Sequence, residues 1–229
     1  MFFYNPTYLI FMAPAFILMM LTSWYVKSAY NKWSKVPSNS RMTGAQAAQQ
    51  LIANSGLYGV TVEGVRGNLS DHYDPRTKTL RLSQGVANSS SVAAVAVAAH
   101  ELGHAMQDAE DYLPLRFRAA LVPAVNVGSW LGWILIMIGL FLNMTNLAWM
   151  GVLVFSGGAI FALATLPVEL NASARAKQLL AETGIIQGEK ERRGVNNVLN
   201  AAALTYVASL VTAVLQLLYF ASLIGGRRR

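Results

Sequence analysis

The sequence predicts an α+β membrane protein that combines four transmembrane helices with one small αβ domain. Three observations support this: long stretches without charge, strand-like patterns between the first two stretches, and a helix with paired histidines after the strands. The predicted segments are a first transmembrane helix (1–26), an αβ domain (27–118), a transmembrane hairpin (119–168), a polar helix (169–193), and a fourth transmembrane helix with a basic tail (194–229).

The membrane prediction depends on where charge is missing. Of the 229 residues, 54% are hydrophobic and 13% are charged, whereas a typical soluble domain has about 25% charged residues. No charge occurs in 1–26, 119–168 or 194–226. A spanning helix needs about 20 apolar residues. The first and third runs are therefore each predicted to form one span, at 7–26 and 197–223, and the second run two spans, at 119–142 and 147–168. The first is predicted to be retained, since it lacks the basic start and cleavage site of a signal peptide.

The basic residues predict which side of the membrane the αβ domain occupies. Lys27, Lys32 and Lys35 follow the first span directly, and the positive-inside rule then places the αβ domain in the cytoplasm. The same path puts the tail 227–229 outside, against the rule, so its side is left open. The net charge of +7 reflects this loop asymmetry, and no pattern indicates nucleic-acid binding.

The segment before the histidines predicts a helix followed by strands. Thr43 and Gln46 fit a capping box for a helix at 43–54, and Gly56 is a stop signal. Strand-like patterns follow at 58–65 and 79–83, the second read as half-buried. The strand directly before the histidine helix is expected either to offer its edge to an extended peptide or to form a plain hairpin.

The Ala-rich helix over 93–107 contains His-Glu-x-x-His, and Ser89 to Ser91 offer N-cap oxygens just before it. His100 and His104 are one turn apart on one face, so both imidazoles can reach a single zinc ion. Glu101 then points beside the metal, which suits a general base acting on water. The chain has no cysteine, so any zinc must be held by His, Asp or Glu.

A third ligand is not fixed by the helix itself. Glu169 is the first charge after the run 119–168, and its position allows either a solvated carboxylate or a third zinc ligand that leaves the fourth position for water. Asp108, Glu110 and Asp111 are the alternatives, although they are more typical of a solvated helix end.

Three motifs together resemble those of a known family. They are Asp-His-Tyr-Asp-Pro at 71–75, His-Glu-Leu-Gly-His-Ala-Met-Gln at 100–107, and Glu-Leu-Asn-Ala-Ser at 169–173. This combination resembles the YugP-type neutral zinc metallopeptidases of bacterial membranes, over nearly the whole chain, and more distantly the HtpX and CAAX-prenyl-type membrane proteases.

The resemblance implies a multi-pass protein of the bacterial plasma membrane with a zincin-like αβ domain and a Zn²⁺ cofactor. It implies His100, His104 and Glu169 as gluzincin-like zinc ligands and Glu101 as general base. One departure is Ser173, where the wider group has an aspartate that would orient a zinc-bound histidine. Serine can still accept a hydrogen bond, but without charge.

The function predicted from these observations is a membrane-embedded zinc metalloendopeptidase that hydrolyses protein or peptide substrates at the cytoplasmic face. The candidate oxyanion donors are His72, Tyr73, Arg175 and Tyr206, and His72 is the foremost as the one histidine outside the motif. Each of them has a packing role as its alternative.

The competing predictions are a zinc-stabilised, non-catalytic membrane scaffold or regulator of a membrane partner, and a zinc hydrolase that acts on lipid or peptidoglycan. A transporter is disfavoured because the apolar runs contain no ionisable residue.

Overall fold

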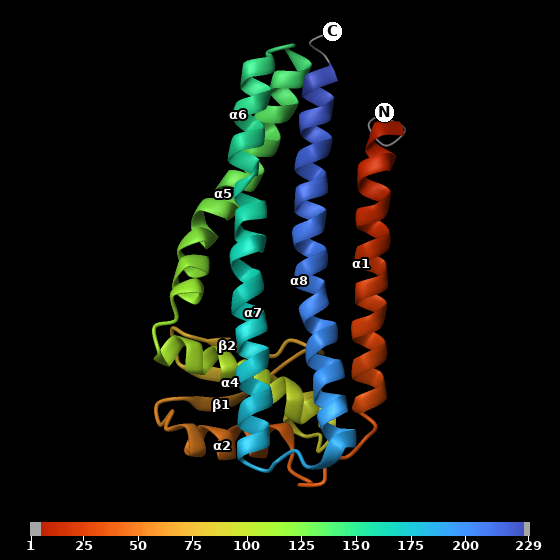
Figure 1. Ribbon diagram of the computed structural model, residues 1–229. Coiled ribbons are helices and arrows are strands. Elements are labelled where there is room, and N and C mark those ends of the chain that lie inside the picture. Colours follow the sequence, from red (N-terminus) through yellow and green to blue (C-terminus); the bar gives the residue numbers. More distant parts are fainter. Residues whose placement is uncertain (1–5, 227–229) are drawn as a thin grey trace. The chain divides into compact units, whose positions relative to one another are not determined.

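The computed structural model describes residues 6–226, which form eight helices and three strands in two compact units (Figure 1). We call them the helical unit, formed by the described parts of Met1–Ser23, Arg116–Pro167 and Thr205–Arg229, and the αβ unit, Trp24–Leu115 with Val168–Leu204. The mostly helical fold with one small sheet agrees with the predicted class.

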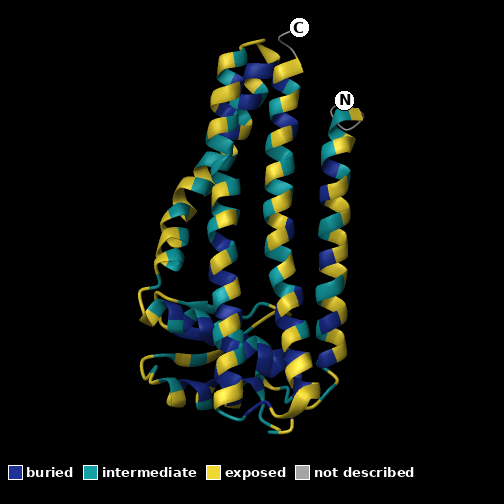
Figure 2. Ribbon diagram, viewed as in Figure 1, coloured by how far each residue is buried: buried dark blue, intermediate teal, exposed yellow. Residues whose placement is uncertain are grey.

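Four long helices are apolar enough to span a membrane, as the sequence predicts. They are α1 (Pro6–Trp33), α5 (Leu113–Phe141), α6 and α7 taken together (Thr145–Phe155 and Gly157–Glu182), and α8 (Gly188–Gly225). Large apolar side chains on them stay exposed, Trp130 by 69% and Leu153 by 74%, and Figure 2 shows such exposed positions along all of these helices. Apolar surface of this extent is typical of helices that face lipid.

Glycines bring two helices of the helical unit close together. A Cβ on Gly132 would lie 2.6 Å from the backbone nitrogen of Phe155, and a Cβ on Gly151 would lie 2.6 Å from that of Ile136. Small residues at such positions let membrane helices pack backbone to backbone. The α5–α6 hairpin is therefore tight, and α5 is bent (Figure 1), as is common for a helix with an internal proline, here Pro123.

The sheet of the αβ unit has the order β1-β3-β2. β1 (Thr61–Val65) pairs parallel with β3 (Thr79–Ser83), and β2 (His72–Asp74) pairs antiparallel with it. β3 was predicted to be half-buried, but Thr79 and Ser83 are buried as well as Leu80 and Leu82. Both buried polar residues are hydrogen-bonded. The Thr79 hydroxyl shares a bond of 3.2 Å with the Thr61 hydroxyl, and the Ser83 backbone N–H and hydroxyl donate to Asp71 at 2.7 and 3.1 Å.

The central place of β3 also corrects the prediction about a free strand edge. Both edges of β3 are paired, so the strand directly before the histidine helix cannot accept a peptide. Among the described residues, the outer edges of the sheet belong to β1 and β2.

The helices of the αβ unit begin where their capping residues predict. α2 (Gly44–Ser55) has both bonds of the Thr43–Gln46 capping box, and Gly56 ends it in the left-handed region at φ 70°. α3 (Gln84–Ala87) leads to α4 (Val92–Ala109), where the Ala94 backbone N–H donates to the Ser91 hydroxyl at 3.2 Å. Most of α4 is buried, so it is the core helix of the αβ unit (Figure 2).

The predicted polar helix at 169–193 is divided between two longer helices. α7 continues without interruption to Glu182, a turn follows, and α8 begins at Gly188. The start of α8 is held by Glu191, a buried carboxylate that accepts backbone hydrogen bonds from Asn39 (2.6 Å) and Gln187 (2.7 Å). A carboxylate in the first turn also suits the positive end of the helix dipole.

Asp74→Asn is expected to weaken the β2–β3 pairing in a pH-dependent way. Hydrogen bonds from Arg81 (2.7 Å) and from the Arg76 backbone lower the pKa of the Asp74 carboxyl from 3.8 to about 2. A carboxyl whose pKa falls on folding stabilises the fold above its unfolded pKa, and that contribution is lost as the pH drops through the folded pKa. The difference between wild type and variant should therefore be largest above pH 4 and shrink towards pH 2.

Denaturant unfolding in detergent at pH 6, 4 and 3 measures this difference. Glu63→Gln is the control, since the exposed Glu63 contacts the same Arg81 at 3.5 Å and should contribute less. Equal unfolding midpoints for wild type and Asp74→Asn at pH 6 would contradict the expectation.

Candidate metal centre

α4 and α7 bring three side chains of the αβ unit together. The Nε2 atoms of His100 and His104 lie 3.3 and 3.5 Å from Glu169 Oε2, and one ligand atom from each residue lies within 4.8 Å of the others. The four-residue spacing puts both imidazoles on one face of α4, with ring centroids 4.9 Å apart. The Glu169 side chain is only 3% exposed, so its carboxylate is buried against the two rings.

The separations fit a zinc ion. Zinc bonds to imidazole nitrogen and carboxylate oxygen are about 2.0–2.1 Å long, so ligand atoms at the corners of a tetrahedron lie about 3.3–3.4 Å apart. The two distances to Glu169 Oε2 match this edge length. Two imidazoles and one carboxylate also form a donor set that zinc accepts, with a fourth position left open.

Both imidazoles make a hydrogen bond through their other nitrogen. His104 Nδ1 lies 3.0 Å from Gln107 Oε1, and His100 Nδ1 lies 3.2 Å from the Ser173 hydroxyl. Ser173, at the position of the aspartate in the wider group, thus keeps a hydrogen bond to a histidine of the motif. Sequence reasoning missed Gln107, although a residue three positions after His104 lies on the same helical face.

Gly103 permits the close crossing of α4 and α7. A Cβ at this position would lie 2.5 Å from the carbonyl oxygen of Ala172 and 3.1 Å from its Cα. Only a glycine lets the two backbones come this near. Gly103 lies between the two histidines in α4, and Ala172 is three residues after Glu169 in α7. The signal in the sequence was a glycine inside an otherwise strong helix pattern.

Glu101 is half-buried, and within residues 6–226 its carboxylate makes no hydrogen bond and no ion pair. Its charge nevertheless acts on the centre. Burial lowers the pKa of His104, but the hydrogen bond and charge of Glu169, together with the charge of Glu101, raise it more, so that the pKa lies above its usual value. The site favours positive charge, as a cation site must.

The alternative third ligands are not in this group, as far as the described residues show. Asp108 accepts a hydrogen bond from the Tyr73 hydroxyl at 3.0 Å. Glu110 accepts two from Arg175, at 2.6 and 2.7 Å, and these lower the pKa of Glu110. Asp111 follows the end of α4 with a positive φ of 51°.

The candidate oxyanion donors belong to three different elements, β2, α7 and α8. His72 is exposed on β2, and its Nδ1 lies 2.8 Å from the Ser70 carbonyl oxygen. Tyr73 and Arg175 are engaged with Asp108 and Glu110, and Tyr206 belongs to the helical unit. Among the described residues, His72 is not part of the group formed by His100, His104 and Glu169.

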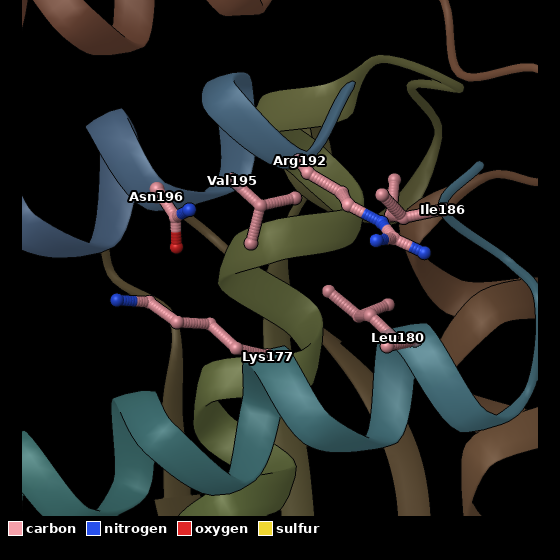
Figure 3. Close-up of a pocket in the computed structure, with 7 residues that line it drawn as sticks. Lys177, Leu180, Ile186, Arg192, Val195 and Asn196 are labelled. Atoms are coloured by element: carbon pink, nitrogen blue, oxygen red, sulfur yellow. The ribbon is translucent and has the colours of Figure 1, made fainter. Parts of the chain in front are cut away.

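A separate small cavity of about 150 Å³ lies between the αβ-unit portions of α7 and α8 (Figure 3). It is lined by Lys177, Leu180, Ile186, Arg192, Val195 and Asn196, among others. It includes none of the residues of the metal group, so it is distinct from the centre on α4.

Four helices long enough to span a membrane, together with three side chains that could hold a metal ion, are features of a membrane metalloprotein. A family model described as "Putative neutral zinc metallopeptidase" matches residues 8–225. The chain is also 46% identical over 195 residues to "Putative membrane protease YugP" of Bacillus subtilis (strain 168), which covers 85% of this chain and 86% of that protein. No solved structure matches the chain. The chain therefore belongs to the neutral zinc metallopeptidase family, which implies Zn²⁺ and a protein or peptide substrate.

Gly103→Ala is expected to destabilise the αβ unit and to weaken zinc binding, because the added methyl group meets backbone atoms of α7. Overpacking of this kind costs about 1–3 kcal/mol. Thermal unfolding and zinc titration of the purified variant measure the two effects. Gly64→Ala is the control, since a Cβ there meets nothing within 4 Å. Wild-type zinc affinity in Gly103→Ala would show that the close crossing is not needed.

Proposed function

We propose that this protein is a zinc metalloendopeptidase whose zinc ligands are His100, His104 and Glu169 and whose general base is Glu101. The observation that carries the proposal is the buried Glu169 carboxylate, 3.3 and 3.5 Å from the two imidazoles, with Glu101 directly after His100 in α4. The family supplies the activity. The αβ unit would then be a zincin-like domain with a gluzincin-like ligand set.

The chemistry follows from the residues around the centre. Zinc supplies Lewis acidity, which polarises the scissile carbonyl and acidifies water. Glu101 is next to His100 in α4, and its uncommitted carboxylate accepts a proton from the attacking water and later delivers it to the leaving amine. His100 and His104 are kept in place by Ser173 and Gln107.

An extended peptide would pair with the outer edge of β2. This edge has no strand partner among the described residues, and the Tyr73–Asp108 hydrogen bond of 3.0 Å ties β2 to the end of α4, one turn beyond His104. Main-chain pairing binds peptides of varied sequence, which suits cleavage within a protein chain. His72, exposed on the same strand, stays the foremost candidate for an oxyanion donor.

The location proposed is the bacterial plasma membrane, with the centre at its cytoplasmic face. Most of the lysines and arginines, including Lys27, Lys32 and Lys35, belong to the αβ unit. The positive-inside rule assigns such segments to the cytoplasm.

Glu101→Gln is expected to bind zinc as the wild type does and to lose proteolysis, by at least the 100-fold that general-base catalysis typically contributes. Zinc per chain and cleavage of a labelled unfolded protein in detergent measure the two properties. The alternative function, a zinc-stabilised scaffold or regulator of a membrane partner, requires neither the base nor cleavage. Undiminished cleavage by the variant would refute the role of Glu101, and no cleavage by zinc-loaded wild type would favour the scaffold.

Glu169→Ala is expected to lose stoichiometric zinc while the protein stays folded, because one of three ligands is removed. Glu182→Ala is the matched control: Glu182 is exposed in the same helix and accepts a hydrogen bond from Gln178, at 2.7 Å. Metal analysis after gel filtration gives the zinc content. Full zinc content in Glu169→Ala would assign the third ligand to another carboxylate.

A further inference from the structure

We infer that Gln107 is a positioning residue that fixes the tautomer of His104, and that Asn171 and Arg175 hold Gln107 in the orientation this requires. The inference rests on the proposed zinc centre. It concerns which nitrogen of His104 has a lone pair available for the metal, which the ligand assignment alone leaves undecided.

Arg175 sets the orientation of the Asn171 side-chain amide, since a guanidinium can only donate hydrogen bonds. Its Nε lies 2.7 Å from the Asn171 side chain, so the amide atom that it meets must be the oxygen. The other two nitrogens of Arg175 donate to the two carboxylate oxygens of Glu110, at 2.6 and 2.7 Å. A paired donation of this kind fixes the guanidinium plane.

The Asn171 oxygen in turn sets the orientation of the Gln107 amide, which is fully buried. Its Nε2 donates to Asn171 Oδ1 at 2.9 Å and to the Val168 carbonyl oxygen at 2.8 Å. Both amide protons are thereby used, and a flipped amide would place its oxygen against two acceptors. The Gln107 Oε1 atom must therefore face His104.

The Gln107 oxygen finally determines the tautomer of the His104 imidazole. Gln107 Oε1 lies 3.0 Å from His104 Nδ1 and can only accept, so Nδ1 must carry the proton. In the neutral ring the lone pair is then on Nε2, the atom that faces Glu169 at 3.5 Å. The same hydrogen bond would fix the orientation of the His104 ring when a metal is bound.

The other histidine is held differently. His100 Nδ1 meets the Ser173 hydroxyl at 3.2 Å, and a hydroxyl can either donate or accept. Ser173 therefore orients the ring of His100 without selecting its tautomer. Gln107 also binds the carbonyl of Val168, the residue next to Glu169, so one buried amide links two of the three zinc ligands.

Gln107→Met tests the inference, because methionine has a similar length but no carbonyl oxygen to accept from His104. Zinc affinity, measured by competition with a chelator, should fall about 10- to 100-fold, as is typical when a partner of a metal-bound histidine is lost. Gln49→Met, at an exposed position of α2, is the control and should bind zinc as the wild type does. Unfolding of the zinc-free proteins shows whether the variants are folded.

A second pair of variants separates hydrogen bonding from packing. Asn171→Asp keeps an acceptor for both Arg175 and Gln107 and should retain zinc affinity within a few-fold of wild type. Asn171→Leu removes the acceptor and should weaken zinc binding. This comparison holds even if Gln107→Met fails to fold.

The outcomes distinguish this inference from the proposed function. Wild-type zinc affinity in a folded Gln107→Met, or equal affinities for the two Asn171 variants, would overturn the positioning role while leaving the zinc centre intact. A wild type that binds no zinc would overturn the centre itself, and the positioning role with it.

Discussion

A buried carboxylate between two imidazoles is the constraint on which the αβ unit depends. Removing a charge from water costs several kcal/mol, which only close partners can offset. Glu169 is 3% exposed, and its partners come from α4, across a crossing where Gly103 leaves room for the backbone of Ala172. The close crossing and the buried charge thus require each other. Either one without the other would leave a cavity or an unpaired ion in the core.

The motif at 71–75 secures the sheet around this crossing. Asp71 accepts two hydrogen bonds from Ser83 at the end of β3, Tyr73 donates to Asp108 of α4, and Asp74 pairs with Arg81. Three of its side chains therefore fasten β2 to its neighbours, while His72 between them is exposed.

Local features of the fold were predictable from the sequence, and those that depend on distant contacts were not. The caps at Thr43 and Ser91 and the four apolar helices follow from neighbouring residues. The parallel pairing of β1 with β3 joins segments across an intervening strand, so β3 became central and buried where alternation predicted an exposed face. At the site, the four-residue spacing of His100 and His104 was sufficient to place the two imidazoles side by side on α4. Glu169 stayed one of several candidates, and Gln107 was missed. Their contacts form where α4 crosses α7, and contacts between residues so far apart in the sequence leave no local pattern.

The position of Glu169 within a helix determines which side chain of α7 faces the two histidines. Glu169 is not on a loop that could adjust on its own, because it lies within one unbroken helix, Gly157–Glu182, whose first half belongs to a membrane-length apolar segment. Successive residues of a helix are about 100° apart around its axis. Turning α7 by that angle would present Leu170 or Val168 to the histidines in place of the carboxylate. The side chain that faces the histidines is therefore set by the rotation of the segment of α7 from Val168 to Glu182, which lies in the αβ unit.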